Sequence, residues 1–98
     1  MPGRAPTAAR AQDDKAKDDA RKAVAQLDLC RRDAGTFQGC RGTGIPRNVE
    51  IADLTATGYR VTAESESGDT FTVTRSARST TRTCTTPGAG SCPPGGKW

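Results

Sequence analysis

The chain has 98 residues, a formal net charge of +4 and a hydrophobic fraction of 33%, with one Trp, one Tyr and two Phe. A chain of this length forms one domain with a modest core, which excludes a second catalytic lobe. The sequence contains no His, so the commonest general base and the commonest metal ligand are both missing. We therefore expect a protein that is not an enzyme, with no catalytic residues, no metal site and no cofactor.

The first ten residues, MPGRAPTAAR, are small, polar and unpatterned. We interpret residues 1–10 as an added leader and residues 11–98 as the folded domain. No run of 18 or more apolar residues occurs, and no hydrophobic signal core is present. The leader is therefore left out of the predicted fold.

Residues 12–34 are predicted to form an amphipathic helix, because small and apolar side chains recur every three or four residues. They are Ala16, Ala20, Ala23, Val24, Leu27, Cys30 and Ala34. Asp13 and Asp14 at the start and Arg31 and Arg32 at the end match the helix dipole, and Gly35 is suited to the C-terminal cap. The stripe is mostly alanine before Val24, so the first turns bury little. We expect these first turns to pack against a structure that is absent from this chain.

The rest of the domain is predicted to be a loop, a sheet and a second loop. Phe37 is expected to anchor the first loop, residues 35–47, to the core. Apolar and polar side chains alternate in the sheet region, residues 48–85, which is typical of short strands. The strands are expected at residues 48–53, 59–64, 70–74 and 80–85, with a turn at residues 65–69. Residues 86–98 carry the late Pro and Gly and are expected to be irregular, with Trp98 packing back on the sheet.

Together these elements predict an α+β fold, in which an N-terminal amphipathic helix packs on a three- to four-stranded antiparallel β-meander. The acidic side chains are interpreted as solvated surface groups, on the exposed helix face or in turns. No paired acids are expected in a cleft. The sparse core also implies that some other interaction stabilises the fold.

Four cysteines, Cys30, Cys40, Cys84 and Cys92, are the expected source of that stability. An even count in a short chain is typical of a disulfide framework and of export to an oxidising compartment. A zinc site is disfavoured, because the sequence neighbours are ten and eight residues apart instead of about two to four. We favour the pairs Cys30–Cys40 and Cys84–Cys92, because each closes a short loop that contains glycine. A crossed pairing, which would tie the helix end to the last strand, stays open.

The net positive charge comes from the last third of the chain. Residues 1–69 contain eleven basic and eleven acidic residues, whereas Arg75, Arg78, Arg82 and Lys97 follow with no further acid. If Arg78 and Arg82 lie on the exposed side of an edge strand or its turn, they form a basic stripe for DNA or other anionic polymers. The alternative, which we favour, is that these residues guard a sheet edge against pairing, since aromatic residues for stacking are scarce there.

Three segments of the sequence resemble type IV pilins of the small, disulfide-bearing kind. They read AQDDKAKDDARKAVAQLDLC, TGYRVTAESESGDTFTVTR and RTCTTPGAGSCPPGGKW, and the resemblance extends over residues 11–98. It implies a ladle-shaped subunit whose N-terminal helix has a hydrophobic first half. In that family this half anchors the precursor in the cytoplasmic membrane, is trimmed and methylated by a prepilin peptidase, and bundles in the filament core. The processing site and this hydrophobic half are missing here, which we interpret as truncation.

The resemblance implies a structural protein that polymerises with identical or related subunits into a cell-surface filament for adhesion, twitching motility or DNA uptake. It also implies that residues 35–46 and the Cys84–Cys92 loop are exposed or contact other subunits. Membrane contact would occur only through the missing segment. One alternative is a minor pilin or surface module that binds DNA through Arg75, Arg78 and Arg82. Another is a small secreted, inhibitor-like disulfide module unrelated to filaments.

Overall fold

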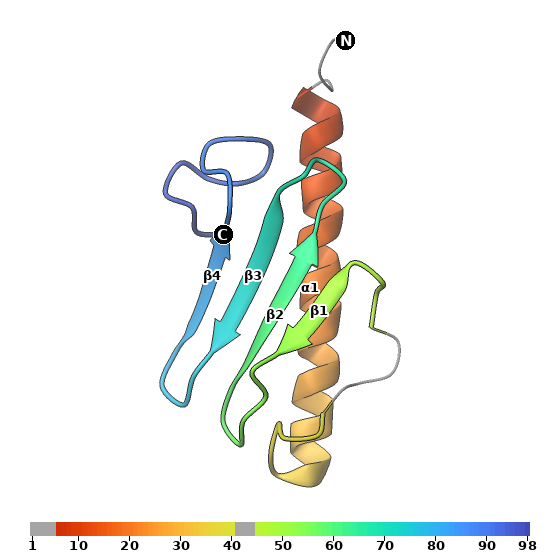
Figure 1. Ribbon diagram of the computed structural model, residues 1–98, viewed down its shortest axis with the longest axis vertical. Coiled ribbons are helices and arrows are strands. Elements are labelled where there is room, and N and C mark those ends of the chain that lie inside the picture. The colour runs from red at the N-terminus through yellow and green to blue at the C-terminus, as the bar shows by residue number, and fades with distance from the viewer. Residues whose placement is uncertain (1–5, 41–44) are drawn as a thin grey trace.

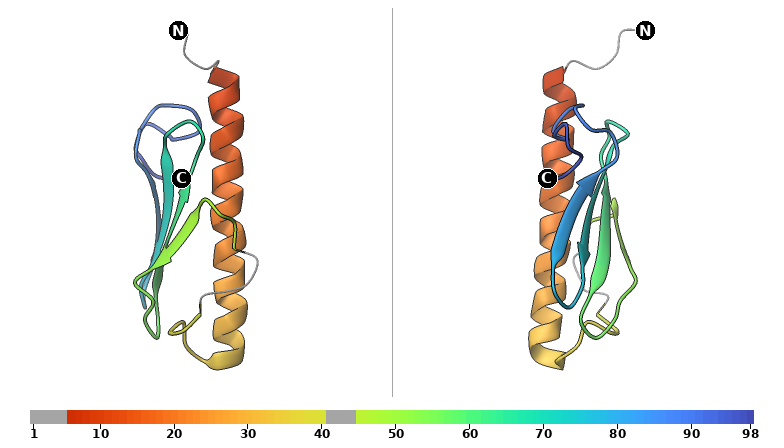
Figure 2. Two further views of the ribbon diagram at one scale, coloured as in Figure 1. Left: turned by 45° about the vertical axis from the view of Figure 1, so that its right-hand side comes forward. Right: turned by 90° about the vertical axis from the view of Figure 1, so that its left-hand side faces the viewer.

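The fold has two layers, one helix against one sheet. The computed structural model describes residues 6–40 and 45–98. Helix α1 (Pro6–Ala34) is followed by the strands β1 (Val49–Ala52), β2 (Tyr59–Glu64), β3 (Thr70–Arg75) and β4 (Thr80–Cys84). The helix lies along one face of the sheet, and none of the described elements covers the opposite face (Figures 1 and 2). The predicted α+β fold with an N-terminal helix is confirmed.

The helix begins earlier than the sequence pattern predicts. It starts at Pro6 instead of Gln12, so residues 6–10 belong to the helix. Proline is favoured at the first helical position because it lacks the N–H group that would have no partner there. Ala8 and Ala9 come two and three residues later, and alanine is the best helix former. Asp13 therefore lies about two turns inside the helix. The first turn contains no acidic residue, so the expected match of acids to the helix dipole is wrong. Residues 1–5 lie outside the described residues.

The C-terminal end of the helix is as predicted. Arg31 and Arg32 lie in the last turn, where positive charge faces the negative end of the helix dipole. Gly35 has a φ of 77°, and its N–H donates to the carbonyl oxygen of Arg31 at 2.7 Å. Glycine adopts this left-handed conformation without strain, so it ends the helix.

The sheet is an antiparallel meander in the order β1-β2-β3-β4. In the central rows Val61 of β2 lies opposite Ile51 of β1 and Val73 of β3, and Val61 and Val73 are buried against the helix. Thr62 and Thr72 form the next row, and because successive side chains alternate they point to the open face. The predicted strands are thus confirmed, with boundaries that differ by at most one residue at either end.

The core lies between the helix and the inner face of the sheet. The helix contributes Ala16, Ala20, Ala23 and Leu27, and the sheet contributes Tyr59, Val61, Ala63, Phe71 and Val73. Phe37 is fully buried, and its ring meets Tyr59 edge-on with 5.0 Å between centroids, which confirms its predicted role as the anchor of the first loop. Trp98 packs back on the sheet as predicted, with its ring centroid 5.8 Å from that of Phe71. Residues 41–44 of the first loop lie outside the described residues.

The helix and the sheet overlap incompletely. The molecule measures 49 × 26 × 15 Å, and the first turns of α1 project beyond the end of the sheet (Figure 1). Ala11 is exposed, whereas Ala16 and Ala20 further along the helix are buried. Among the described residues, no helix combines the length and the apolar composition that crossing a bilayer requires.

A candidate interaction site at the disulfide-bonded C-terminal loop

Both disulfides join cysteines that are close in sequence. Cys30 pairs with Cys40 and Cys84 pairs with Cys92, with Cα–Cα distances of 5.9 and 5.8 Å. The favoured pairing is therefore confirmed, and the crossed pairing is not formed. Two disulfides are typical of a protein that folds in an oxidising compartment such as the extracellular space.

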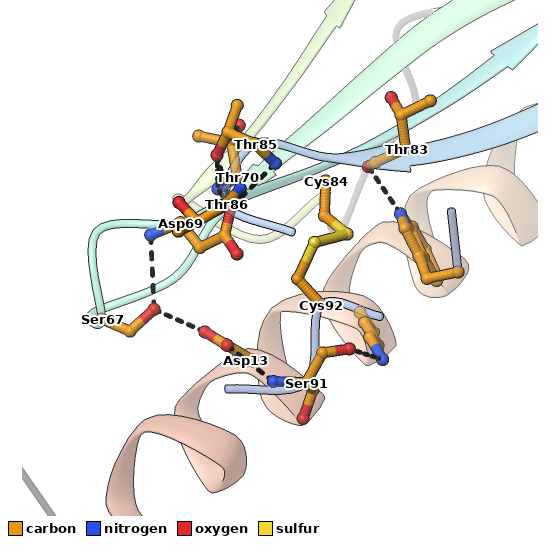
Figure 3. Close-up of a disulfide and its surroundings, with 12 residues drawn as sticks. Asp13, Ser67, Asp69, Thr70, Thr83, Cys84, Thr85, Thr86, Ser91 and Cys92 are labelled. Carbon is orange, nitrogen blue, oxygen red and sulfur yellow. Dashed lines mark hydrogen bonds between the residues drawn. A yellow bond between two sulfur atoms is a disulfide. The ribbon is translucent and has the colours of Figure 1, made fainter. Parts of the chain in front are cut away.

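The C-terminal loop, residues 85–98, turns back along the outer edge of β4. The N–H of Cys84 donates to the carbonyl oxygen of Gly96 at 2.9 Å, and Lys97 forms an isolated bridge with Thr83. The indole N–H of Trp98 donates to the carbonyl oxygen of Thr83 at 2.7 Å. The loop is irregular, as predicted, but these contacts give it a fixed path beside the helix (Figures 2 and 3).

A buried carboxylate of the helix holds this loop in place. Asp13 is 1% exposed. Its Oδ1 accepts hydrogen bonds from the hydroxyl groups of Ser65, at 2.6 Å, and Ser67, both in the turn between β2 and β3. Its Oδ2 accepts a hydrogen bond from the N–H of Ser91 at 3.0 Å (Figure 3). One side chain therefore joins the helix, the turn and the C-terminal loop.

These contacts keep Asp13 ionised. Burial by itself would raise the pKa of this carboxyl. The hydrogen bonds from Ser65, Ser67 and Ser91, together with the charge of Lys17, outweigh that effect and hold the pKa of Asp13 below its usual value. At neutral pH the junction of helix, turn and loop therefore contains a buried negative charge that hydrogen-bond donors from two other segments stabilise.

Further contacts at Ser91 tighten the same junction. Its hydroxyl donates to Asp14 Oδ1 at 2.7 Å and lies 3.1 Å from the carbonyl oxygen of Arg10, while its own carbonyl oxygen accepts from Lys17 Nζ at 2.7 Å. Gly90 has a φ of 54°, and a methyl group at this position would collide with the carboxylate of Asp13. Glycine is therefore required where the loop passes the helix.

A second buried carboxylate fixes the point at which the C-terminal loop leaves the sheet. Asp69 is 5% exposed. Its Oδ1 accepts hydrogen bonds from the N–H groups of Thr70, Thr85 and Thr86 at 2.8, 2.9 and 3.1 Å, and from the hydroxyl of Thr85 (Figure 3). Within the described residues its Oδ2 is buried without a hydrogen-bond partner. Asp69 thus ties the β2–β3 turn to the end of β4.

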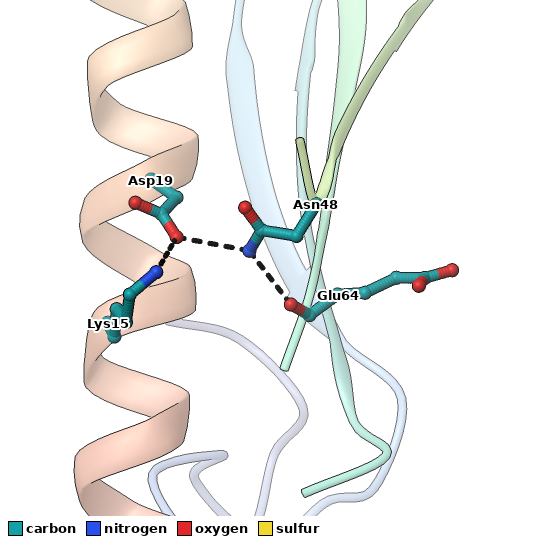
Figure 4. A network of polar contacts seen from close by, with 4 residues as sticks. All are labelled: Lys15, Asp19, Asn48 and Glu64. Atoms are coloured by element: carbon teal, nitrogen blue, oxygen red, sulfur yellow. Dashed lines mark hydrogen bonds and ion pairs between the residues drawn. The ribbon is translucent and has the colours of Figure 1, made fainter. Parts of the chain in front are cut away.

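A third buried carboxylate joins the helix to the start of β1, away from the C-terminal loop. Asp19 Oδ2 accepts hydrogen bonds from Lys15 Nζ at 2.9 Å and from Asn48 Nδ2 at 3.0 Å (Figure 4). The same nitrogen of Asn48 lies 2.9 Å from the carbonyl oxygen of Glu64. The hydrogen bond to Asp19 raises the pKa of Lys15.

These carboxylates correct the interpretation that every acidic side chain is a solvated surface group. A signal for Asp13 was present in the sequence, because it precedes Ala16 by three residues and Ala20 by seven and so shares their face of the helix. Asp69 gave no comparable signal. Its partners lie up to 17 residues away, and only the return of β4 beside β3 brings them together.

The four basic residues singled out in the sequence do not form a single stripe. Arg75 turns toward the helix, where its Nη1 lies 3.4 Å from Asp28 Oδ1. Arg78 is exposed in the turn between β3 and β4, as expected. Arg82 on β4 and Lys97 in the C-terminal loop are exposed near the outer edge of the sheet.

Arg82 instead joins two basic residues of the helix around the ring of Trp98. The distances to the ring centroid are 5.6 Å from Arg82 Cζ, 5.5 Å from Arg21 Cζ and 5.9 Å from Lys17 Nζ. Cations at such distances are attracted to the negative face of an indole ring. Lys17 and Arg21 were not predicted from the sequence, because the helix and β4 are far apart along the chain.

The polar groups around the C-terminal loop hold the loop in one position. Within residues 6–40 and 45–98, no group of three His, Cys, Asp or Glu side chains is arranged to hold a metal ion. The buried acids accept hydrogen bonds from serine, threonine, asparagine, lysine and backbone donors. No protein-family model matches the sequence, and neither the curated proteins nor the solved structures contain a match.

Proposed function

We propose that the chain is the head of a structural subunit of a type IV pilus, which polymerises into a cell-surface filament. The observation that supports this most strongly is the shape of the subunit. A single 29-residue helix runs along one face of an antiparallel sheet and projects beyond it at its N-terminal end (Figure 1). A helix that extends past its own sheet offers a free side for packing against neighbouring subunits.

An exposed small side chain near the N-terminal end of α1 supports the same proposal. Ala11 is exposed, and small side chains allow close approach of another helix. The body of α1 is covered by the sheet, with Ala16, Ala20 and Ala23 at most 1% exposed. The Cys84–Cys92 loop, held against α1 by Asp13, would present one defined surface in every copy.

The proposed role is assembly, and the subunit would act without catalysis. The filament would lie outside the cell, which fits two disulfides, and its precursor would be held in the cytoplasmic membrane by a hydrophobic segment. Adhesion, twitching motility and DNA uptake are the activities that such a filament would serve. The partners of the chain would be identical or related subunits.

This proposal can be tested by shearing surface filaments from the cells that make the protein and analysing their composition. We expect mass spectrometry to find the chain as a stoichiometric component, and we expect its deletion to remove it from the preparation or to abolish the filaments. A strain producing the Asp18→Asn variant is a suitable control, because this side chain is exposed on the helix. Filaments that form normally and never contain the chain would contradict the proposal.

A second candidate function is the binding of DNA or another polyanion. It is favoured by the convergence of Lys17, Arg21 and Arg82 on Trp98, which concentrates positive charge beside the exposed Lys97. Retention of the chain on DNA should fall steeply with salt and disappear in the Arg78→Glu/Arg82→Glu variant. Lys22→Glu/Arg32→Glu is the matched control, since it changes the same number of exposed charges on the helix. Retention that the two variants share equally, or no retention at all, would eliminate this function.

A further inference from the structure

Opposite edges of the sheet carry opposite charges. Residues 45–69, which supply β1, β2 and their turns, contain five acidic and two basic residues. Residues 70–98, which supply β3, β4 and the C-terminal loop, contain four basic residues and no acid. Because the strand order follows the chain, this division along the sequence becomes a division across the sheet (Figure 1).

Few of these charged side chains form ion pairs within the fold. Arg60 pairs with Asp53 at 3.3 Å, and Arg75 pairs with Asp28. Among the described residues, the other basic residues of the β4 side, Arg78, Arg82 and Lys97, form no ion pair with an acid, and all three are exposed. We call these three residues the basic edge.

On the opposite side, Glu50 and Glu64 are likewise exposed and form no ion pair with a described basic residue.

The acidic side of the sheet borders a hollow next to the helix. A hollow of about 500 Å³ lies between the helix and the ends of β1 and β2, and Lys15, Asp19, Arg47, Glu64 and Glu66 are among its lining residues. Lys15 and Asp19 pair with each other, as Figure 4 shows. An adjoining hollow is lined by Glu50, Glu64 and Arg47. We call this region the acidic hollow.

We propose that the basic edge of one copy docks against the acidic hollow of a second copy of the same chain. The two surfaces differ and lie on opposite sides of the subunit, so the contact is heterologous. A contact of this kind continues from copy to copy as an open array unless the rotation between copies closes a ring. The inference rests on the proposed function, for which it names the surfaces that meet.

Charge reversal tests the contact in the isolated chain. In the Arg78→Glu/Arg82→Glu variant the basic edge becomes acidic, so both surfaces carry acidic residues. In the Glu50→Lys/Glu64→Lys variant the acidic hollow gains lysines, so both surfaces carry basic residues. We expect the wild-type chain to associate at low salt and to dissociate at high salt, with affinity about tenfold weaker once the charges are screened. Each variant alone should stay monomeric in sedimentation experiments. An equimolar mixture should associate, because the acidic edge of one variant can dock against the basic hollow of the other.

Two controls make this result specific. Lys22→Glu/Arg32→Glu changes the same amount of charge on the exposed face of the helix and should associate like the wild type. The altered side chains are all exposed, so the melting temperatures should match that of the wild type, apart from a small decrease where Arg82→Glu removes the contact with the Trp98 ring. A wild-type chain that stays monomeric at low salt, variants that associate as it does, or a mixture that fails to associate would each overturn the inference.

Incorporation into filaments separates this inference from the proposed function. If the Arg78→Glu/Arg82→Glu chain enters surface filaments as well as the wild-type chain does, the contact is refuted and the filament function stands. If the wild-type chain is absent from filaments, the proposed function fails, whatever the chain does in solution.

Discussion

The two disulfide-closed loops have nearly the same size, but opposite kinds of interaction hold them to the fold. The Cys30–Cys40 loop is anchored by Phe37, whose ring is fully buried. The Cys84–Cys92 loop has no such ring inside it, and its Ser91 is held by the buried carboxylate of Asp13. A chain with few large apolar residues thus uses burial at one end of the helix and hydrogen-bonded charge near the other.

The largest effect is expected at the apolar anchor. Phe37→Ala should lower the free energy of unfolding by about 3–5 kcal/mol, because it removes buried surface and leaves a cavity between the helix and Tyr59. Denaturant unfolding measures the change. Leu29→Ala is the control, since Leu29 is 48% exposed and its truncation should cost less than about 0.5 kcal/mol. A Phe37→Ala protein as stable as this control would show that the loop is anchored in another way.

The disulfides themselves should matter almost equally. Loops of ten and eight residues lose similar chain entropy on closure, so Cys30→Ala/Cys40→Ala and Cys84→Ala/Cys92→Ala should each cost about 2–3 kcal/mol. The local consequences should differ. Phe37 should keep the first loop protected from hydrogen exchange when its disulfide is removed, whereas the second loop should lose protection. Equal loss of protection in both loops would mean that the apolar anchor contributes nothing local.

The smallest of the three effects is expected at the polar anchor, and it depends on pH. Asp13→Asn should cost about 1.5–3 kcal/mol at neutral pH, the range for hydrogen bonds to a charged group. Because the pKa of Asp13 is lower in the folded state, its contribution is fully present above its unfolded pKa of about 4 and is lost as the pH falls through the folded value.

The pH dependence can be checked by measuring thermal unfolding between neutral pH and about pH 2, a range that includes the ordinary pKa of Asp. The wild-type protein should lose more stability than Asp13→Asn over this interval. Asp18→Asn, at an exposed carboxylate paired with Arg21, is the control and should follow the wild-type curve closely. Identical pH curves for wild type and Asp13→Asn would rule out an ionised Asp13 as the anchor.

Local sequence patterns were sufficient to predict most of the fold. Alternation around Val61 and Val73 predicted β2 and β3, and Gly35 predicted the helix end, because these signals depend on neighbouring residues alone. The disulfide pairing was favoured for the same reason, since short loops containing glycine can close easily. The start of the helix was predicted too late, because the small residues before Gln12 have high helix propensity but no apolar stripe.

The candidate site was less predictable, because its contacts are long-range. Ser65 and Ser91 are 52 and 78 residues away from Asp13, and no local pattern relates these positions. The cations around Trp98 likewise come from α1 and β4. The exposed positions of Arg78 and Arg82 were predicted, because they follow from the order of the strands. The position of Arg75 was not predicted, because a tertiary contact turns its side chain toward Asp28 of the helix.

Assembly into the proposed filament would require the same surface in every copy, and we expect Asp13 to give the Cys84–Cys92 loop one position. Amide hydrogen exchange at Ser91, compared between the wild type and Asp13→Asn at neutral pH, tests this most directly. We expect exchange at Ser91 to be at least about tenfold faster in the variant, with Gly35 and Cys40 unchanged. Equal exchange at Ser91 in the two proteins, or equal acceleration at all three amides, would contradict the claim.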